Sequence, residues 1–386
     1  MRLRHSNALA AVLLACLAGV AVAQPQASDR AGDLEREYLA PLRAKSCPPS
    51  VTRMQGETIA LTVSAVPLQG MNPSRKAIGD LTFVAGFHLV STDKRFGGLS
   101  DVDLLDDGRL LAITDQGDFV WLDLADDGVT PTRARIAPLQ NAAGEPLRGK
   151  QGGDAEDLAY NDGLALVSFE RDHRVLAFDI AGCSAAARGA PVTFGGYGGD
   201  FAAAFDSQNL KVDGNSGAEG LAITPDWFLF AGLETPSKGA SPLSARAIET
   251  APEFDQAIGK GAPPVVGLDI IPDGDALRVF SLHRSTKPLA TNMITLLETR
   301  FTRGFDLSQV PAHRMSQIES RKHERFVPAR SVVLAQMNVL VTVDNFEGVA
   351  ARQMPDGRVR LYVVSDDNFS GKQRTLLMIY DVPSLA

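Results

Sequence analysis

One short pattern, a pair of apolar strands joined by a tight turn, recurs along most of the chain and constrains its fold more than any other feature. Each copy has a short apolar run, a turn written DDG, NDG, TPD or PDG, and a second run rich in apolar and β-branched residues. Asp-Gly or Pro-Asp between two such runs is typical of a β-hairpin. The copies are residues 100–115, 156–170, 219–234, 266–284 and 347–366.

The spacing of the hairpins suits a ring of small antiparallel sheets. Successive copies begin roughly 50 to 80 residues apart, and no long 3.6-residue periodicity competes with them. Residues 121–124, 175–180 and 376–382 continue three of the hairpins into a third strand. We predict an all-β fold, a β-propeller of about six blades. A pair of β-sandwiches would explain the hairpins, but not why the same turns and the same acidic ends recur.

Further strands are expected on either side of the repeats. Residues 57–66 and 81–90 are rich in strand-forming residues, and the interval 286–340 supplies more. The N-terminal strands are expected to close the ring by completing the blade that the C-terminus builds. Residues 51–386 would then form a single propeller domain, preceded by an extension over residues 24–50.

The first 23 residues are predicted to be a signal peptide. Arg2 and Arg4 precede an apolar run, and Ala21-Val22-Ala23 is a small-residue cleavage site. A lipoprotein signal ending at Cys16 is the alternative, but the apolar run continues past that cysteine. We favour simple export to the periplasm or the medium, with no integral membrane segment in the mature chain.

Charge and cysteine content follow from export. Removing residues 1–23, which hold two basic residues and no acidic one, changes the formal net charge from −8 to −10. This charge argues against nucleic acid as a partner. Cys47 and Cys183 remain, and they form either one disulfide or two unpaired buried thiols, because spacing alone does not decide the geometry.

Acidic residues recur at two fixed places in the aligned hairpins. The two strands of a hairpin run antiparallel, so the start of the first and the end of the second lie at the same end. In a propeller these ends gather on one rim around the central channel. The first place holds Asp101, Glu156 with Asp157, Glu219 and Glu347, and the second holds Asp115, Glu170, Glu234 and Asp366 with Asp367.

Carboxylates crowded on one rim repel each other unless a cation is bound. Oxygen ligands without Cys or clustered His favour Ca²⁺, and Mg²⁺ or Mn²⁺ less. A single acid at a strand end can simply stabilise a turn, but a recurring Glu is not a usual turn residue. The expected metal ligands are Glu156, Glu219, Glu347, Asp366 and Asp101.

Basic residues are expected on the same rim. Arg171, Arg284, Lys372 and Arg374 would bind an anionic group held against the metal, or else pair with neighbouring carboxylates at the surface. The sequence has no GxSxG, HExxH, GxxxxGK[ST] or strand-to-helix GxGxxG motif. Common nucleophile, zinc and nucleotide chemistries therefore have no support.

Five segments resemble the exported bacterial phytase-like family called "esterase-like activity of phytase", over about residues 80–386. They are GLSDVDLLDDGRLLAITD, SFERDHRVLAFD, SGAEGLAITPD, DNFEGVA and VSDDNFSGKQRTLLMIYDV. The resemblance implies a β-propeller and metal-dependent hydrolysis of an ester. Alkaline propeller phytases hold several Ca²⁺ ions in an acidic cleft. Glu219-Gly220 and Glu347-Gly348 are similar to the acidic elements of such proteins, and Asp366-Asp367 to their paired aspartates.

These observations predict an exported, monomeric hydrolase that acts on a phosphate or other anionic small-molecule ester with rim-bound Ca²⁺. Glu347, Asp367 and His283 are the candidate catalytic residues. A Ca²⁺-dependent lactonase or arylesterase is a second hypothesis. A third is a non-catalytic propeller that binds a ligand or protein in the periplasm and holds the metal for structure alone.

Overall fold

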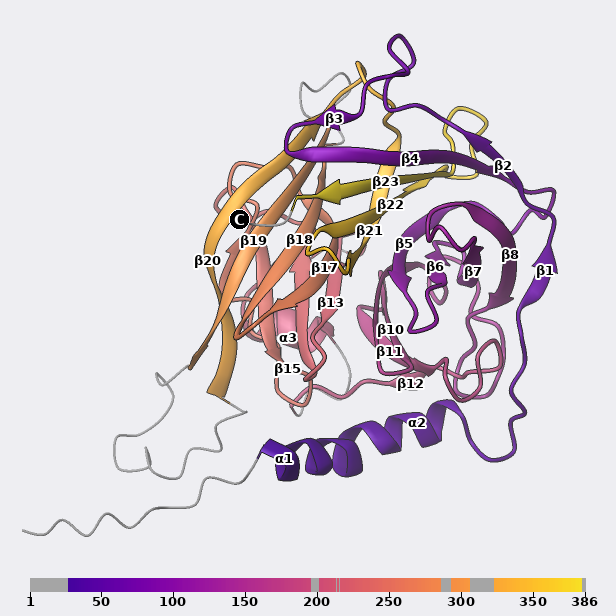
Figure 1. Cartoon of the computed structure of the whole chain (residues 1–386). Coiled ribbons are helices and arrows are strands. Elements are labelled where there is room, and N and C mark those ends of the chain that lie inside the picture. The colour runs from indigo at the N-terminus through magenta and orange to yellow at the C-terminus, as the bar shows by residue number, and fades with distance from the viewer. Residues whose placement is uncertain are drawn as a thin grey trace, which may run out of the picture.

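Four antiparallel sheets are arranged around the centre of the molecule, and the eight-stranded one contains two blades (Figure 1). In the computed structural model, residues 27–195, 201–212, 214, 216–285, 293–305 and 323–383 are described, so the predicted signal peptide lies outside the described residues. The five innermost strands are β5, β9, β13, β17 and β21. Each contacts the next, and β21 contacts β5, which closes the ring. The chain is a β-propeller, as predicted.

The described strands make five blades, so the expected count of about six is not confirmed. Blade 1 is β5 (Leu99–Leu104), β6 (Leu110–Thr114), β7 (Asp118–Leu124) and β8 (Pro131–Pro138), with β1 (Glu57–Ile59) outside. Blade 2 is β9 (Ala155–Asn161), β10 (Leu164–Phe169), β11 (Arg174–Asp179) and β12 (Ala190–Pro191). Blade 3 is β13 (Ala218–Ile223), β14 (Phe228–Leu233), β15 (Ser241–Ala247) and β16 (Gln256–Ile258). Blade 4 is β17 (Val265–Asp273), β18 (Ala276–Arg284), β19 (Ile294–Phe305) and β20 (Glu324–Met337).

The C-terminal part of the chain and the N-terminal strands build blade 5 together. Its strands are β21 (Asn345–Gln353), β22 (Val359–Asp366), β23 (Leu376–Val382), β4 (Leu81–Val90), β2 (Thr62–Ala65) and β3 (Ala77–Ile78). β4 pairs antiparallel with β23, so segments nearly 300 residues apart share one sheet (Figure 1). The predicted closure of the ring by N-terminal strands is confirmed.

All five predicted hairpins are present as the two inner strands of a blade. Their turns place glycine at positive φ, for example +83° at Gly108 and +85° at Gly357, where a residue with a Cβ is disfavoured. The second strands β6, β10, β14 and β22 are buried along their whole length. Blades pack on both of their faces, which explains why these strands are continuously apolar rather than alternating.

Helices occupy the outside of the ring. α1 (Ala27–Leu34), the π-helical turn η1 (Glu35–Leu39) and α2 (Ala40–Ser46) form one segment beside β11 and β12, and α3 (Phe201–Ser207) lies against β11 (Figure 1). Leu39 and Leu42 are buried among residues of blades 2 and 3. No helix in the described ranges is both long and apolar enough to span a bilayer.

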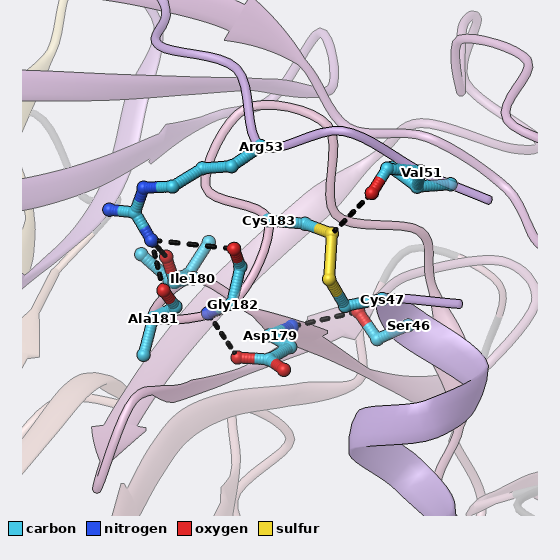
Figure 2. Close-up of a disulfide and its surroundings, with 9 residues drawn as sticks. All are labelled: Ser46, Cys47, Val51, Arg53, Asp179, Ile180, Ala181, Gly182 and Cys183. Carbon is cyan, nitrogen blue, oxygen red and sulfur yellow. Dashed lines mark hydrogen bonds between the residues drawn. A yellow bond between two sulfur atoms is a disulfide. The ribbon is translucent and has the colours of Figure 1, made fainter. Parts of the chain in front are cut away.

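A disulfide fastens the end of this helical segment to blade 2 (Figure 2). It joins Cys47 to Cys183, with the two Cα atoms 5.5 Å apart, so the paired alternative is the one the fold forms. Beside it, the backbone N–H of Asp179 donates to Ser46 Oγ at 2.7 Å. The closed loop spans 136 residues, long enough for the crosslink to restrict the unfolded chain substantially.

Replacing both Cys47 and Cys183 by alanine is expected to lower the free energy of unfolding by about 2–5 kcal/mol, because the unfolded chain regains the entropy that the crosslink removes. Urea denaturation would show the change as a lower midpoint. Wild-type protein in dithiothreitol should then match the variant, and dithiothreitol should not affect the variant. An unchanged midpoint would contradict a stabilising role for the disulfide.

Candidate functional site

Each innermost hairpin has a β-bulge at the start of its inner strand, all at the same end of the ring. At a bulge the pairing skips a residue, and the strand bends so that a side chain is re-aimed. The skipped residues are Ser100 in β5, Glu156 with Asp157 in β9, Glu219 in β13, Val266 in β17 and Glu347 in β21.

Five of these skipped residues, one per blade, line a single cavity of about 190 Å³ at the mouth of the central channel. A second residue from each blade, located where the second strand ends, also lines it. The full lining is Ser100, Asp115, Lys150, Glu156, Glu170, Glu219, Glu234, Val266, Arg284, Glu347, Asp366 and Asn368. The predicted rim of carboxylates is therefore one concave site, acidic on blades 1, 2, 3 and 5, whereas blade 4 contributes Val266 and Arg284.

Three carboxylates of blade 2 converge closely enough to bind one cation. Asp154, Glu156 and Glu170 each offer an oxygen, and these oxygens all lie within 4.8 Å of one another. We call these three residues the blade 2 trio. The Glu219 carboxyl of blade 3 lies within hydrogen-bonding reach of the Glu170 carboxyl. Such an all-oxygen set matches the ligands that Ca²⁺ prefers.

Basic side chains balance the charge of this cluster only in part, since Lys150 and Arg171 both pair with Asp154. Burial, reinforced by the charges of Glu170 and Asp154, holds the pKa of Glu156 well above its ordinary range. Burial and the neighbouring Glu156 and Glu234 raise the pKa of Glu219 in the same direction. Oδ1 of Asp115 is buried and has no hydrogen-bond partner among the described residues. Acidic groups held in this way favour either bound protons or a bound cation.

Glu347 stands across the cavity in a different environment. Its Oε2 accepts an ion pair from Arg284 at 2.9 Å, and its Oε1 accepts a hydrogen bond from Asn345 Nδ2 at 2.8 Å. Burial raises the pKa of Glu347 to about 8, although Arg284 partly opposes the rise. Burial also raises the pKa of Asp366 to about 6. Both groups change protonation near neutral pH, as groups that transfer protons must.

The Glu-Gly pairs of the sequence have a steric explanation. Glu347 points to the cavity, and Gly348 then passes beside β5, where a Cβ atom would lie 2.5 Å from the Asp101 Cα. A Cβ on Gly267 of the neighbouring blade would lie 2.7 Å from the Glu347 carbonyl oxygen. Glycine lets the inner strands approach each other, and that approach brings the glutamates together around one small mouth.

Substituting Gly348 by alanine is expected to lower the free energy of unfolding by about 1–3 kcal/mol, because backbone of β5 must move to admit the methyl group. Thermal or urea unfolding would measure the loss. Gly371→Ala is the matched control, since a Cβ there meets nothing within 4 Å. Equal stability of the two variants would contradict this explanation.

The structure does not bring Asp101 to the cavity. Its carboxylate is fully buried below the mouth, where Oδ2 accepts from the Leu158 N–H at 3.0 Å and Oδ1 from the Val349 N–H at 3.2 Å. Asp101 thereby connects β5 to β9 and β21. The bulge explains the difference, because it places Ser100 rather than Asp101 at the position that Glu156, Glu219 and Glu347 hold in other blades.

Two of the three candidate catalytic residues also lie elsewhere. His283 is fully buried, its ring nitrogens lie 2.9 Å from the Pro263 carbonyl oxygen and from Ser281 Oγ, and burial lowers its pKa to about 4. Asp367 stabilises the turn after β22, where its oxygens accept from the Gly98 N–H and the Thr375 hydroxyl. Glu347 lines the cavity, as do the predicted ligands Glu156, Glu219 and Asp366.

Three of the four predicted anion-binding residues already pair with a carboxylate, and Arg284 does so with Glu347 Oε2 at 2.9 Å. Arg171 Nε donates to Asp154 at 3.0 Å, and Arg374 Nε to Asp344 at 3.0 Å, so both already have a carboxylate. Arg284 lines the acidic cavity and also a neighbouring one of about 390 Å³. Lys372 and Arg374 line that second cavity together with Asp344, so positive charge continues from Arg284 of blade 4 beyond the acidic cavity.

Asp154 and Lys150 are site residues that sequence reasoning missed. They lie in the segment between β8 and β9, outside the hairpin repeat. The predicted acidic strand ends also include Glu170, Glu234 and Asp115, which are not among the predicted ligands. Their recurrence at the end of the second strand was the available signal.

Comparisons with known proteins identify a family. A family model described as "Phytase-like: Esterase-like activity of phytase" matches residues 94–369. No curated protein matches the chain. Similar solved structures include the PQQ domain of pyranose dehydrogenase from Coprinopsis cinerea, which is 9% identical over 86% of this chain and 98% of that chain, with a TM-score of 0.37.

Two further structures show the same limited likeness. The Cps50 (Swd1) β-propeller domain of Myceliophteria thermophila is 13% identical over 73% of this chain and 86% of its own, with a TM-score of 0.30. A thermostable family-43 glycoside hydrolase is 9% identical over 73% of this chain and 89% of its own, with a TM-score of 0.42. At these scores the likenesses carry no argument about chemistry.

Proposed function

Because the chain belongs to the phytase-like family described as esterase-like activity of phytase, we propose that it is an exported hydrolase of a phosphate or other anionic ester that works with Ca²⁺ at the channel mouth. The observation that carries the proposal is the convergence of the blade 2 trio, with oxygens within 4.8 Å, beside a cavity that carboxylates from four blades line, Glu156 and Glu170 of the trio among them. Among the residues that the structure describes, no Cys or His side chain lines this cavity.

The residues fit a hard cation. The blade 2 trio and Glu219 would hold Ca²⁺, and the buried Oδ1 of Asp115 is a further oxygen without a partner among the described residues. When bound, the ion would polarise the ester and lower the pKa of a coordinated water. A bound cation would also replace mutual carboxylate repulsion by attraction and so stabilise the ionised form of these buried groups.

The opposite side of the cavity would handle the substrate. Glu347, with a pKa of about 8, would accept or return a proton at the reacting oxygen, and Asn345 holds its carboxyl in place. Arg284 would bind the negative oxygens of the ester, since it reaches both the acidic cavity and the neighbouring one. Lys372 would hold a more distant anionic group. Substrates with negative charge next to the scissile bond are therefore favoured.

Export agrees with the Cys47–Cys183 disulfide, because such crosslinks persist in oxidising compartments. The predicted signal peptide would direct the chain there. This part of the proposal is tested separately, by fractionating the native host and locating the processed protein.

The proposed reaction is tested by assaying the mature protein on an aryl phosphate, an aryl acetate and a lactone, each with Ca²⁺ and with chelator. Calcium-dependent release from the aryl phosphate is the expected result. Turnover of the acetate or lactone alone would instead support the lactonase or arylesterase hypothesis. Inactivity on all three in both conditions would overturn the enzymatic proposals and leave a binding propeller.

A further inference from the structure

A lysine ammonium lies among the carboxylates of the acidic cavity. Lys150 belongs to the segment between β8 and β9, and its Nζ donates to Asp154 Oδ1 at 2.8 Å and to Asp115 Oδ2 at 3.4 Å. The carboxylates that recur in the hairpins do not predict Lys150, and no role for it follows from the family resemblance. It supplies positive charge to the part of the cavity where the carboxylates converge.

The ammonium competes directly for a member of the blade 2 trio. Asp154 is 1% exposed in its side chain, and both of its oxygens are engaged, Oδ1 by Lys150 and Oδ2 by Arg171. A divalent ion bound to Asp154, Glu156 and Glu170 would lie close to the ammonium and be repelled by it. Lysine and a metal ion therefore cannot both use Asp154 Oδ1 without a cost.

Lys150 is also free to leave. Its side chain is 60% exposed, whereas its carboxylate partner is buried and fixed at the start of β9. The adjacent Gly149 carries no side chain, so release of the ammonium requires only the side chain of Lys150 to move. Loss of the ammonium would leave a buried carboxylate without a positive partner, so release of Lys150 requires that a divalent cation take its place.

We propose that Lys150 is a tethered cation that neutralises Asp154 in the metal-free protein and is released into solvent when Ca²⁺ binds the blade 2 trio. The proposal rests on the metal site put forward above. It makes calcium binding a competition, in which the lysine lowers the apparent affinity and discriminates against cations too weakly charged to displace it. The released ammonium would then stand at the mouth, where an anionic substrate enters.

Calorimetric titration with CaCl₂ of wild type and Lys150→Met tests the competition. Methionine keeps an unbranched apolar stem and removes the charge, so the variant is expected to bind Ca²⁺ roughly three- to tenfold more tightly. Lys94→Met removes an equal charge from an exposed position that does not line the acidic cavity, and its affinity should remain that of wild type.

Acylation of lysines followed by mass spectrometry measures the release itself. Modification of Lys150 relative to the other lysines should increase several-fold when Ca²⁺ is added, because the ammonium loses its carboxylate partners. Equal affinity of wild type and Lys150→Met, or unchanged labelling in protein that binds Ca²⁺, would overturn the role of Lys150 alone. Failure of both proteins to bind Ca²⁺ would overturn the metal site on which the inference rests.

Discussion

A variant in which Glu156 and Glu219 are both glutamine is expected to lose calcium binding at concentrations that saturate the wild type, and with it any calcium-dependent ester hydrolysis. Each substitution preserves shape and one neutral oxygen, but removes a negative charge from the centre of the cavity. Loss of a single well-placed group around a metal costs about 10- to 100-fold in affinity. Two losses in one ligand set should therefore reduce affinity by about 10²- to 10⁴-fold.

Calcium content after dialysis and the aryl phosphate assay would measure the effect. The matched control replaces Glu37 and Glu145, both exposed and outside the cavity, by glutamine, which gives the same change in net charge. The control should bind calcium as the wild type does. Unchanged calcium stoichiometry in Glu156→Gln/Glu219→Gln would show that the metal, if bound, lies at another site.

The repeated hairpins could be predicted from the sequence because a tight turn between two apolar runs is a local signal. The blade count could not, because it depends on which strands complete which sheet. The strand-rich interval 286–340 is predicted to supply further strands, and two of them, β19 and β20, are the outer strands of blade 4. Residues 81–90 add a strand to blade 5, as predicted.

Locating the site was possible only to within one residue, for a physical reason. A β-bulge inserts a residue without changing the hydrophobic pattern, so Ser100 and Asp101 could not be distinguished from the alignment. Side chains of adjacent residues on a strand point to opposite faces. The environments of His283 and Arg284 therefore differ, because His283 is buried in the core and Arg284 lines the cavity.

The site residues that lie outside the hairpin repeat could not be predicted. The segment before β9 places Lys150 and Asp154 beside the carboxylates of blade 2. The acidic tendency of the rim was visible in the sequence. Which basic side chain pairs with which carboxylate depends on distances and burial. This pairing is therefore a property of the folded chain.

In the presence of a chelator, the protein is expected to lose stability as the pH rises from about 5 to about 8. Burial raises the pKa of Glu347 to about 8, of Asp269 to about 7 and of Asp366 to about 6. Unfolded carboxyl groups titrate near 4. Between those values the folded protein holds protons that the unfolded chain has released, so the free energy of unfolding falls by about 1.4 kcal/mol per pH unit for each such group.

Calcium should reverse this dependence at the channel mouth. The ion binds ionised carboxylates of the folded protein, so protons compete with it at low pH and the competition disappears as pH rises. Melting temperatures measured from pH 5 to 9 should therefore separate progressively between calcium and chelator, with the largest difference at the alkaline end. Asp269, buried away from the cavity, should keep part of the decline in both conditions.

The glutamine double variant separates the two contributions to this pH dependence. Without Glu156 and Glu219, calcium should no longer raise the melting temperature at any pH. The decline in chelator should also become shallower, because two carboxyl groups with raised pKa values no longer titrate. A wild-type melting temperature that stays constant with pH in chelator would contradict the raised pKa values. It would mean that cations of the chain itself, Lys150 and Arg284 among them, already balance the ionised mouth.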